Sequence, residues 1–166
     1  MRRFRGRRAS MADLVLDTTY LLPTFGVGVR LEGFQTLFPR ILEEYTVLYN
    51  PISIVEAKWI VLRLAKQRPD KRTELLRRFR KGLNAILMDE RLRQTELTNP
   101  EVEAIADTLL TGMGVADYFD RLIYAMAAYR KAILLTEDEE LIRVARRREV
   151  EAPARVLRWR DIAKTQ

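Results

Sequence analysis

Leu14-Val15-Leu16 is a short apolar run that is followed at once by Asp17-Thr18-Thr19. A continuous apolar run of this kind is typical of a strand buried on both faces of a parallel sheet. Open α/β sheets bind their ligands at the carboxyl ends of the strands. Asp17 therefore stands where a ligand-binding side chain is expected.

Strand-like runs alternate with helical patterns along the rest of the chain. Further strands are predicted at 46–49, 132–135 and 155–159, with a weaker one at 93–97. Apolar residues at helical spacing predict helices at 34–44, 53–66, 72–87, 100–110, 117–129 and 139–147. This alternation favours an α/β fold with a mainly parallel sheet.

The composition indicates one globular domain. The chain has 166 residues, of which 48% are hydrophobic and 32% charged, and this length suits one domain better than two. We divide it into a basic tail at residues 1–10 and a single domain at residues 11–166. No apolar run approaches the roughly 20 residues of a membrane-spanning helix. No signal core follows the basic start either, so we expect a cytoplasmic protein.

The net charge of +7 is concentrated in the tail. Five arginines near the start leave a balance of only +2 for the rest: Arg2, Arg3, Arg5, Arg7 and Arg8. Two interpretations of this tail remain open, a solvated segment or an arm that binds nucleic acid.

Histidine and cysteine are absent from the sequence. Their absence excludes disulfides and catalytic thiols, and also the commonest general base and the usual zinc ligands. Any metal site must therefore use oxygen ligands, which suit hard cations such as Mg²⁺.

Four acidic residues stand at comparable junctions of the predicted elements. Asp17, Glu56 and Asp138 follow predicted strands, and Asp120 opens a helix that leads into one. A parallel sheet gathers such junctions along one edge, with the first and fourth strands plausible neighbours at the switch point. Carboxylates gathered there cannot all stay ionised without help. We predict that Mg²⁺ or Mn²⁺ supplies it, orienting a water and stabilising a phosphoryl leaving group.

Each acid also has a structural interpretation. Asp17 and Asp138 can cap the helices that follow them. Asp117 lies three residues before Asp120 on the same helix face. The helix dipole favours carboxylates at the start of a helix, so one of these two acids is readily explained as a cap. Ser53-Ile54-Val55-Glu56 fits the S-x-x-E capping box, in which the glutamate returns to the cap amide.

The glutamates around Asp138 are expected to be solvated in the first turn of the last long helix: Glu137, Glu139 and Glu140. Taken singly, the capping interpretations suffice for several acids. Taken as a set at one sheet edge, the acids favour a shared site.

Four segments occur in a fixed order: Leu-Val-Leu-Asp-Thr-Thr-Tyr-Leu-Leu at 14–22, Ser-Ile-Val-Glu-Ala at 53–57, Tyr-Phe-Asp-Arg-Leu-Ile-Tyr-Ala-Met-Ala at 118–127 and Leu-Leu-Thr-Glu-Asp at 134–138. Together they resemble the PIN domain family, of which the VapC-type toxin ribonucleases are common small members. No single segment is specific, but their order and spacing match across residues 13–159.

The resemblance implies a three-layer α/β/α sandwich with a central parallel sheet, and metal-dependent cleavage of RNA by an endoribonuclease. By position, the family's three core acids correspond to Asp17, Glu56 and Asp120. A more variable fourth acid corresponds to Asp138, with Asp117 as an auxiliary. The family's hydroxyl positions correspond to Thr19 and Thr136.

The resemblance also implies a toxin–antitoxin pair, with an antitoxin protein as partner, and a homodimer. The long basic stretch at 63–96 departs from the family pattern and would form a clamp-like helical pair over the site or a partner surface. Trp59 and Tyr124 are candidates for the dimer contact, with core packing as the simpler interpretation of both.

Two other functions compete with a nuclease. A PIN-fold scaffold would bind RNA or protein without cutting, using the basic groups at 77–81 and 143–148 to hold phosphates. A phosphatase of the haloacid dehalogenase type also begins from an Asp at a strand end. That chemistry requires a second Asp two residues later, where this chain has Thr19.

Overall fold

The computed structural model describes residues 11–165. The Arg-rich segment at residues 1–10, expected to be a basic tail, lies outside the described residues, as does Gln166. In the described part of the chain, none of the helices combines the length and the apolar character that a membrane crossing requires.

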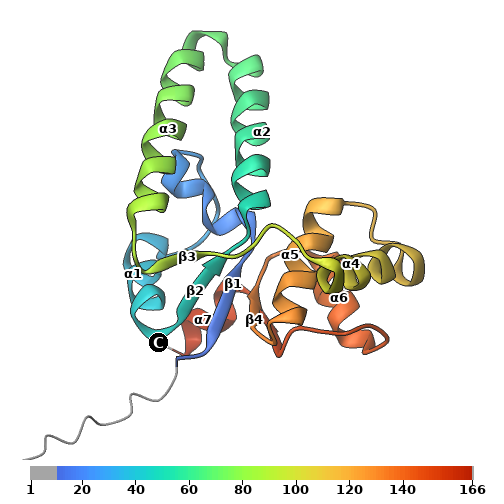
Figure 1. The fold of residues 1–166 in the computed structure, drawn as a ribbon. Coiled ribbons are helices and arrows are strands. Elements are labelled where there is room, and N and C mark those ends of the chain that lie inside the picture. The colour runs from blue at the N-terminus through green and yellow to red at the C-terminus, as the bar shows by residue number, and fades with distance from the viewer. Residues whose placement is uncertain (1–10, 166) are drawn as a thin grey trace, which may run out of the picture.

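Five parallel strands form one sheet in the order β3-β2-β1-β4-β5 (Figure 1). The central strand β1 (Asp13–Leu16) pairs with β2 (Thr46–Tyr49) and with β4 (Ile133–Leu135). The edge strands are β3 (Leu92–Gln94) and β5 (Arg155–Leu157). The expected parallel α/β fold is confirmed, and so is the pairing of the first strand with the strand after residue 132.

Residues 11–165 also form seven α-helices and three short 3-10 helices, of which all but α7 lie between strands. The α-helices are α1 (Phe34–Glu44), α2 (Pro51–Gln67), α3 (Arg72–Met88), α4 (Pro100–Met113), α5 (Tyr118–Tyr129), α6 (Glu139–Arg147) and α7 (Trp159–Lys164). The 3-10 helices are η1 (Thr18–Tyr20), η2 (Leu22–Phe25) and η3 (Pro69–Lys71).

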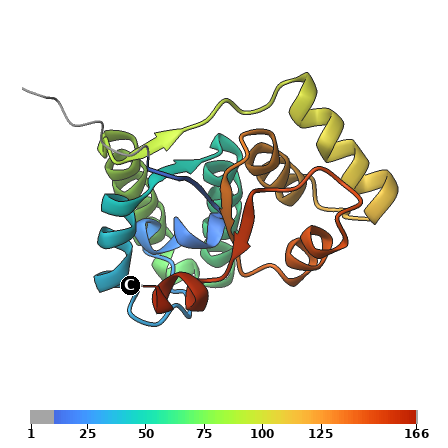
Figure 2. The same ribbon diagram turned by 90° about the horizontal axis from the view of Figure 1, so that it is seen from below.

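The two faces of the sheet bury separate hydrophobic clusters, because successive side chains of a strand point to opposite faces. Val15, Leu48 and Leu134 pack against α4, α5 and α6. The residues that alternate with these along each strand, such as Leu14, pack against α1, α2, α3 and α7. Seen from below, α4 and α6 lie on the opposite side of the sheet from α1 and α3 (Figure 2). This is the three-layer α/β/α arrangement.

Two expected helix ends and one expected strand end differ from the structure. Asn50 caps α2, since its side chain accepts a hydrogen bond from the Ile52 amide at 2.9 Å, so the capping box starting at Ser53 is wrong. α4 continues past its expected end at residue 110 to Met113, and its C-cap is Gly114, which has a positive φ of 73°. The last strand stops at Leu157, and Trp159 begins α7 instead.

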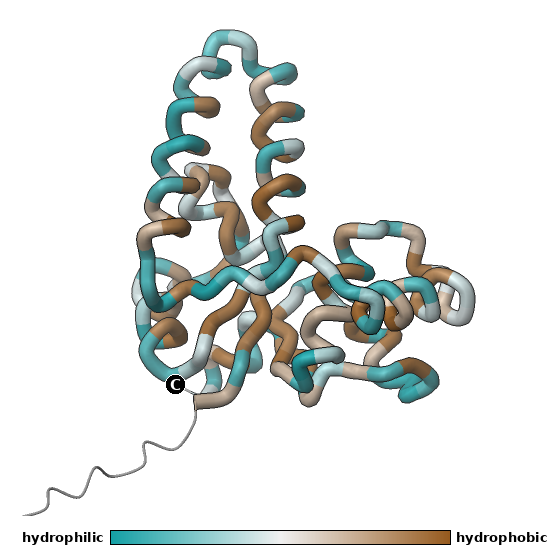
Figure 3. The backbone as a smooth tube through the Cα atoms, in the orientation of Figure 1, coloured by the Kyte–Doolittle hydropathy of each residue, from teal (hydrophilic) through white to brown (hydrophobic). Residues whose placement is uncertain are grey.

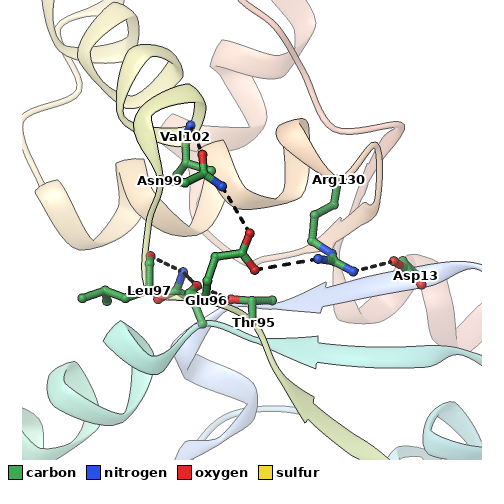
Figure 4. Close-up of polar contacts among 8 residues, drawn as sticks. Asp13, Thr95, Glu96, Leu97, Asn99, Val102 and Arg130 are labelled. Atoms are coloured by element: carbon green, nitrogen blue, oxygen red, sulfur yellow. Dashed lines mark hydrogen bonds and ion pairs between the residues drawn. The ribbon is translucent and has the colours of Figure 1, made fainter.

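A connection between two layers is fixed by the polar contacts of residues 95–99, which lead from β3 to α4 (Figure 4). Asn50 donates hydrogen bonds to the carbonyls of Glu96 and Leu97. The Glu96 carboxylate lies 4.0 Å from Arg130, which also approaches Asp13 at 3.6 Å. This chain of contacts attaches the segment to the end of α5 and the start of β1.

α2 and α3 form a helical hairpin that projects beyond the carboxyl ends of the strands (Figure 1). Its base rests on η2, where the rings of Phe25 and Phe79 stack with centroids 4.6 Å apart. Gly82 of α3 is buried against the same segment. A Cβ atom at Gly82 would lie 2.3 Å from the Thr24 carbonyl oxygen, so the helix approaches η2 at backbone contact distance.

Gly82→Ala should lower the free energy of unfolding, because the added methyl group meets backbone atoms that cannot rotate away. We expect a loss of about 1–3 kcal/mol, measured by urea unfolding. Gly112→Ala in α4 is the matched control, since a Cβ atom there would meet nothing within 4 Å beyond its own stretch of helix. It should gain about 0.5–1 kcal/mol. Equal stability of the two variants would contradict the close approach.

Candidate functional site

Asp17 is held rigidly at the carboxyl end of the central strand. It is 7% exposed, and its amide continues the strand pairing by donating to the Leu135 carbonyl. One carboxylate oxygen accepts a hydrogen bond from the Thr18 amide at 2.6 Å, and the other accepts one from the Thr136 hydroxyl at 2.6 Å. The second contact joins residues from the ends of β1 and β4, so it depends on the pairing of these two strands.

Glu56 reaches the same edge from the second turn of α2. Its carboxylate accepts a hydrogen bond from the Thr18 hydroxyl, rather than returning to the cap amide of its own helix. The Ser53 hydroxyl, expected to cap this helix, is buried without a hydrogen-bond partner among the described residues. Glu56 is therefore oriented by a tertiary contact and is not needed as a cap.

Asp138 caps α6 and also faces the site. Its side chain accepts a hydrogen bond from the Leu141 amide at 2.9 Å, and its own amide donates to the Thr136 hydroxyl at 3.0 Å. The capping interpretation is confirmed for this residue. The Thr136 hydroxyl thus donates to Asp17 while it accepts from Asp138, which links the two acids.

Asp117 and Asp120, at the start of α5, differ in their contacts. Asp117 is the cap, accepting hydrogen bonds from the amides of Phe119 and Asp120 at 2.8 and 3.3 Å. The Asp120 carboxylate has no hydrogen-bond donor among residues 11–165 and lies in the first turn of the helix. α5 starts at the carboxyl edge of the sheet, because it runs back to feed β4.

One pocket of about 330 Å³ brings the predicted acids together. We call it the acid pocket, and it is lined by Asp17, Thr18, Thr19, Leu22, Glu56, Ile60, Asp120, Glu137 and Asp138. Asp117 lines a neighbouring pocket instead, together with Glu56. Thr136 lies behind Asp17, fully buried.

Two residues of the acid pocket have contacts that the sequence did not reveal. Thr18, rather than Thr19, supplies the hydroxyl that binds Glu56; Thr19 lines the pocket without such a bond. Glu137, expected to be solvated, accepts hydrogen bonds from the Tyr20 hydroxyl at 2.8 Å and the Trp159 amide at 2.6 Å. It fixes α7 beside the pocket.

Burial raises the pKa values of Asp17, Glu56 and Asp120, and the charges of neighbouring carboxylates add to the rise. Burial raises the pKa of Asp17 to about 6, against the opposing effect of its two hydrogen bonds. Burial raises the pKa of Asp120 to about 8, and the charges of Asp17, Asp117, Asp138 and Glu56 add to this rise. Asp120 is the most strongly affected because no donor compensates its charge.

The residues of the acid pocket fit a hard divalent cation by their chemistry. The side-chain atoms that could bind a metal are all oxygens. Burial and the neighbouring negative charges both raise the pKa of Asp120, and a bound cation would offset the negative charge. Among residues 11–165, no three acidic side chains lie close enough to hold a metal ion directly. Mg²⁺ characteristically keeps several waters and few protein ligands, so the dispersed carboxylates remain compatible with it.

Comparisons with known proteins agree with this architecture. A model of the PIN domain family matches residues 14–147. No curated protein sequence matches the chain significantly.

Solved structures with the same fold are distant in sequence. VapBC2 from Rickettsia felis, bound to a DNA fragment from its promoter, has 16% identity and a TM-score of 0.60, covering 89% of this chain and 98% of that one. PAE2754 from Pyrobaculum aerophilum has 11% identity and a TM-score of 0.58, covering 92% and 94%. FitAB bound to an IR36 DNA fragment has 17% identity and a TM-score of 0.53, covering 88% and 94%. At these identities the similarity shows the fold.

Asp120→Asn should change how stability depends on pH. The folded protein retains the Asp120 proton up to about pH 8, whereas the unfolded chain releases it near pH 4. Stability without metal should therefore fall as pH rises between these values. The variant lacks this contribution, so in EDTA its melting temperature should match the parent at pH 4 and exceed it by about 2–5 °C at pH 8.

Asp107→Asn, at an exposed position of α4, is the control and should melt like the parent at both pH values. Thermal unfolding followed by circular dichroism checks the prediction. Parallel pH profiles for the parent and Asp120→Asn would show that this carboxyl carries no electrostatic strain.

Proposed function

Because this chain belongs to the PIN domain family, whose members are generally nucleases, we propose that it is an endoribonuclease dependent on Mg²⁺ or Mn²⁺. It hydrolyses phosphodiester bonds of RNA at the acid pocket. The observation that carries this proposal is the convergence of Asp17, Glu56, Asp120 and Asp138, from four separate segments, on one pocket.

The residues have distinct tasks in this proposal. Asp17, Glu56 and Asp120 would hold the cation together with water molecules that it retains, because the three carboxylates are too dispersed to bind it directly as a set. Asp138 and Asp117 would add negative charge around it. When bound, the cation polarises the phosphate and lowers the pKa of an attacking water. Thr136 and Thr18 keep Asp17 and Glu56 in place through hydroxyl donors. Supporting hydrogen bonds of this type fix the orientation of ligating carboxylates.

The proposal includes a toxin–antitoxin setting. Two of the similar structures, VapBC2 and FitAB, are complexes bound to DNA. By analogy, this chain is the toxin of a type II pair, forms a homodimer in the cytoplasm and is inhibited by an antitoxin protein. This part of the proposal rests on the shared family and fold, whereas the nuclease activity rests on the residues of the acid pocket.

Cleavage should require the acids of the pocket and a divalent cation. Asp17→Asn and Asp120→Asn should each lower the cleavage rate by about 100-fold or more, since each weakens a site worth several kcal/mol of charge stabilisation. The assay incubates labelled RNA with the protein in Mn²⁺ or Mg²⁺, with EDTA and Asp107→Asn as controls. EDTA should abolish cleavage, and Asp107→Asn should cleave like the parent.

Two results would contradict the nuclease. Cleavage that persists in EDTA, or full activity in both acid variants, would remove the acid pocket from the reaction. Salt-dependent RNA binding without cleavage in any divalent metal would instead favour the non-cutting scaffold.

Thr18→Val and Thr136→Val should each lower kcat/KM by about 10- to 100-fold, because each removes a donor that orients a carboxylate. Thr19→Val is the matched control, since Thr19 lines the pocket without bonding an acid, and it should cost less. Serine variants at 18 and 136 retain the hydroxyl and should recover most of the activity. An equal loss for all three valine variants would show that the hydroxyl contacts are not specific.

A further inference from the structure

Trp59 is an exposed aromatic residue beside the acid pocket. The chain has two tryptophans: Trp159 is 4% exposed, whereas Trp59 is 60% exposed. Tyr124 is buried at 1% as expected, but core packing is wrong for Trp59. Val55 and Leu62 of α2 are exposed as well, and exposed apolar side chains that are grouped in this way mark interaction sites.

The ring of Trp59 is positioned by a contact with α5. It meets the Phe119 ring edge-on, with centroids 5.7 Å apart and planes at 72°. The two rings line a pocket of about 540 Å³ with Glu56, Leu62, Arg63 and Asp117. Glu56 lines the acid pocket as well, so the two pockets adjoin at this side chain. We call the second one the aromatic pocket.

Three residues of α2 lead from one pocket to the other. Glu56, Trp59 and Arg63 are spaced by three and four residues and therefore share one side of the helix. The rise of the helix places Trp59 about 4.5 Å and Arg63 about 10 Å beyond Glu56 along its axis. Arg63 is exposed, and its charge partly opposes the burial that raises the pKa of Glu56. α2 also carries more hydrophobic residues than α3, as Figure 3 shows.

We propose that Trp59 is a stacking platform for an unpaired base of the RNA strand whose phosphodiester enters the acid pocket, and that Arg63 contacts a neighbouring phosphate of that strand. This inference rests on the proposed function and assigns Trp59 and Arg63 as residues that position the substrate strand. A base within a duplex is already stacked on both faces, so it cannot lie on Trp59 without first being unpaired. Aromatic platforms beside cationic groups are a general means of holding single strands.

The polar rim of the aromatic pocket favours a nucleotide over an apolar protein surface. A helix or a second copy seated on Trp59 and Leu62 would cover the charges of Glu56, Arg63 and Asp117. Burying such charges without partners is costly. A nucleotide presents an uncharged ring to Trp59 and a negative phosphate to Arg63, the basic residue among those that line the pocket.

The test compares Trp59→Ala, Trp59→Phe and Tyr129→Ala, each combined with Asp120→Asn so that the RNA stays intact during binding. Tyr129 is a 40% exposed aromatic residue at the far end of α5 and is the matched control. The probes are a short RNA without self-complementarity and a duplex containing the same strand. Binding is followed by fluorescence anisotropy of labelled RNA.

Trp59→Ala should weaken binding of the single strand by about 5- to 150-fold, as expected for one lost stack. Trp59→Phe should lose less, and Tyr129→Ala should bind like its parent. Intrinsic fluorescence adds a direct readout because Trp159 is buried: the single strand should quench the parent emission, and Trp59→Phe should abolish the quenching. The duplex should bind the parent and Trp59→Ala alike.

Unchanged single-strand affinity in Trp59→Ala would overturn the inference. A second result would also overturn it: Trp59→Ala converts a dimer into a monomer, as measured by sedimentation, while RNA binding stays intact. The aromatic pocket would then be the contact with a second copy of the chain. The nuclease proposal is judged separately, by cleavage in Mn²⁺ with Trp59 unaltered. Binding by the Asp120→Asn proteins decides the role of Trp59 even if the parent cuts no RNA.

Discussion

Both carboxylate oxygens of Asp17 are engaged by donors from its own loop and from the end of β4. This buried acid stands at the end of the central strand, so the strands on either side bring their own junctions to it. β2 leads to Asn50 and then to Glu56, and β4 leads to Thr136 and Asp138. Repulsion between these acids opposes folding, and the sheet core on both faces supplies the stability that tolerates it.

Local patterns were sufficient to predict most of the fold. β2, α1 and α6 lie where their apolar periodicity and flanking residues place them, because each is determined by its own sequence and by burial. The start of α2 was misplaced since two residues compete as caps. Asn50 prevails because its amide group also donates to the carbonyls of residues 96 and 97, a contact that no local pattern encodes.

Less of the candidate site than of the fold can be predicted from the sequence. The acids could be found because strand order alone gathers their junctions at one edge. The roles of Thr18 and Glu137 could not, since they depend on which way neighbouring hydroxyls point and on partners 38 and 22 residues away. The exposure of Trp59 could not be predicted either, because a helical pattern does not show which apolar side chains stay exposed when a helix projects from the rest of the domain.

The acid pocket draws on residues from Asp17 to Asp138, and this spread has a consequence for synthesis. A nascent chain that has emerged only through α2 holds Asp17 and Glu56 but not yet Asp120 or Asp138. Since the ribosome releases the chain from its N-terminus, a nuclease of this design stays incompetent until β4 has joined the sheet. Under the proposed ribonuclease function, the messenger being translated would thereby be spared during most of the time in which its product is attached to it.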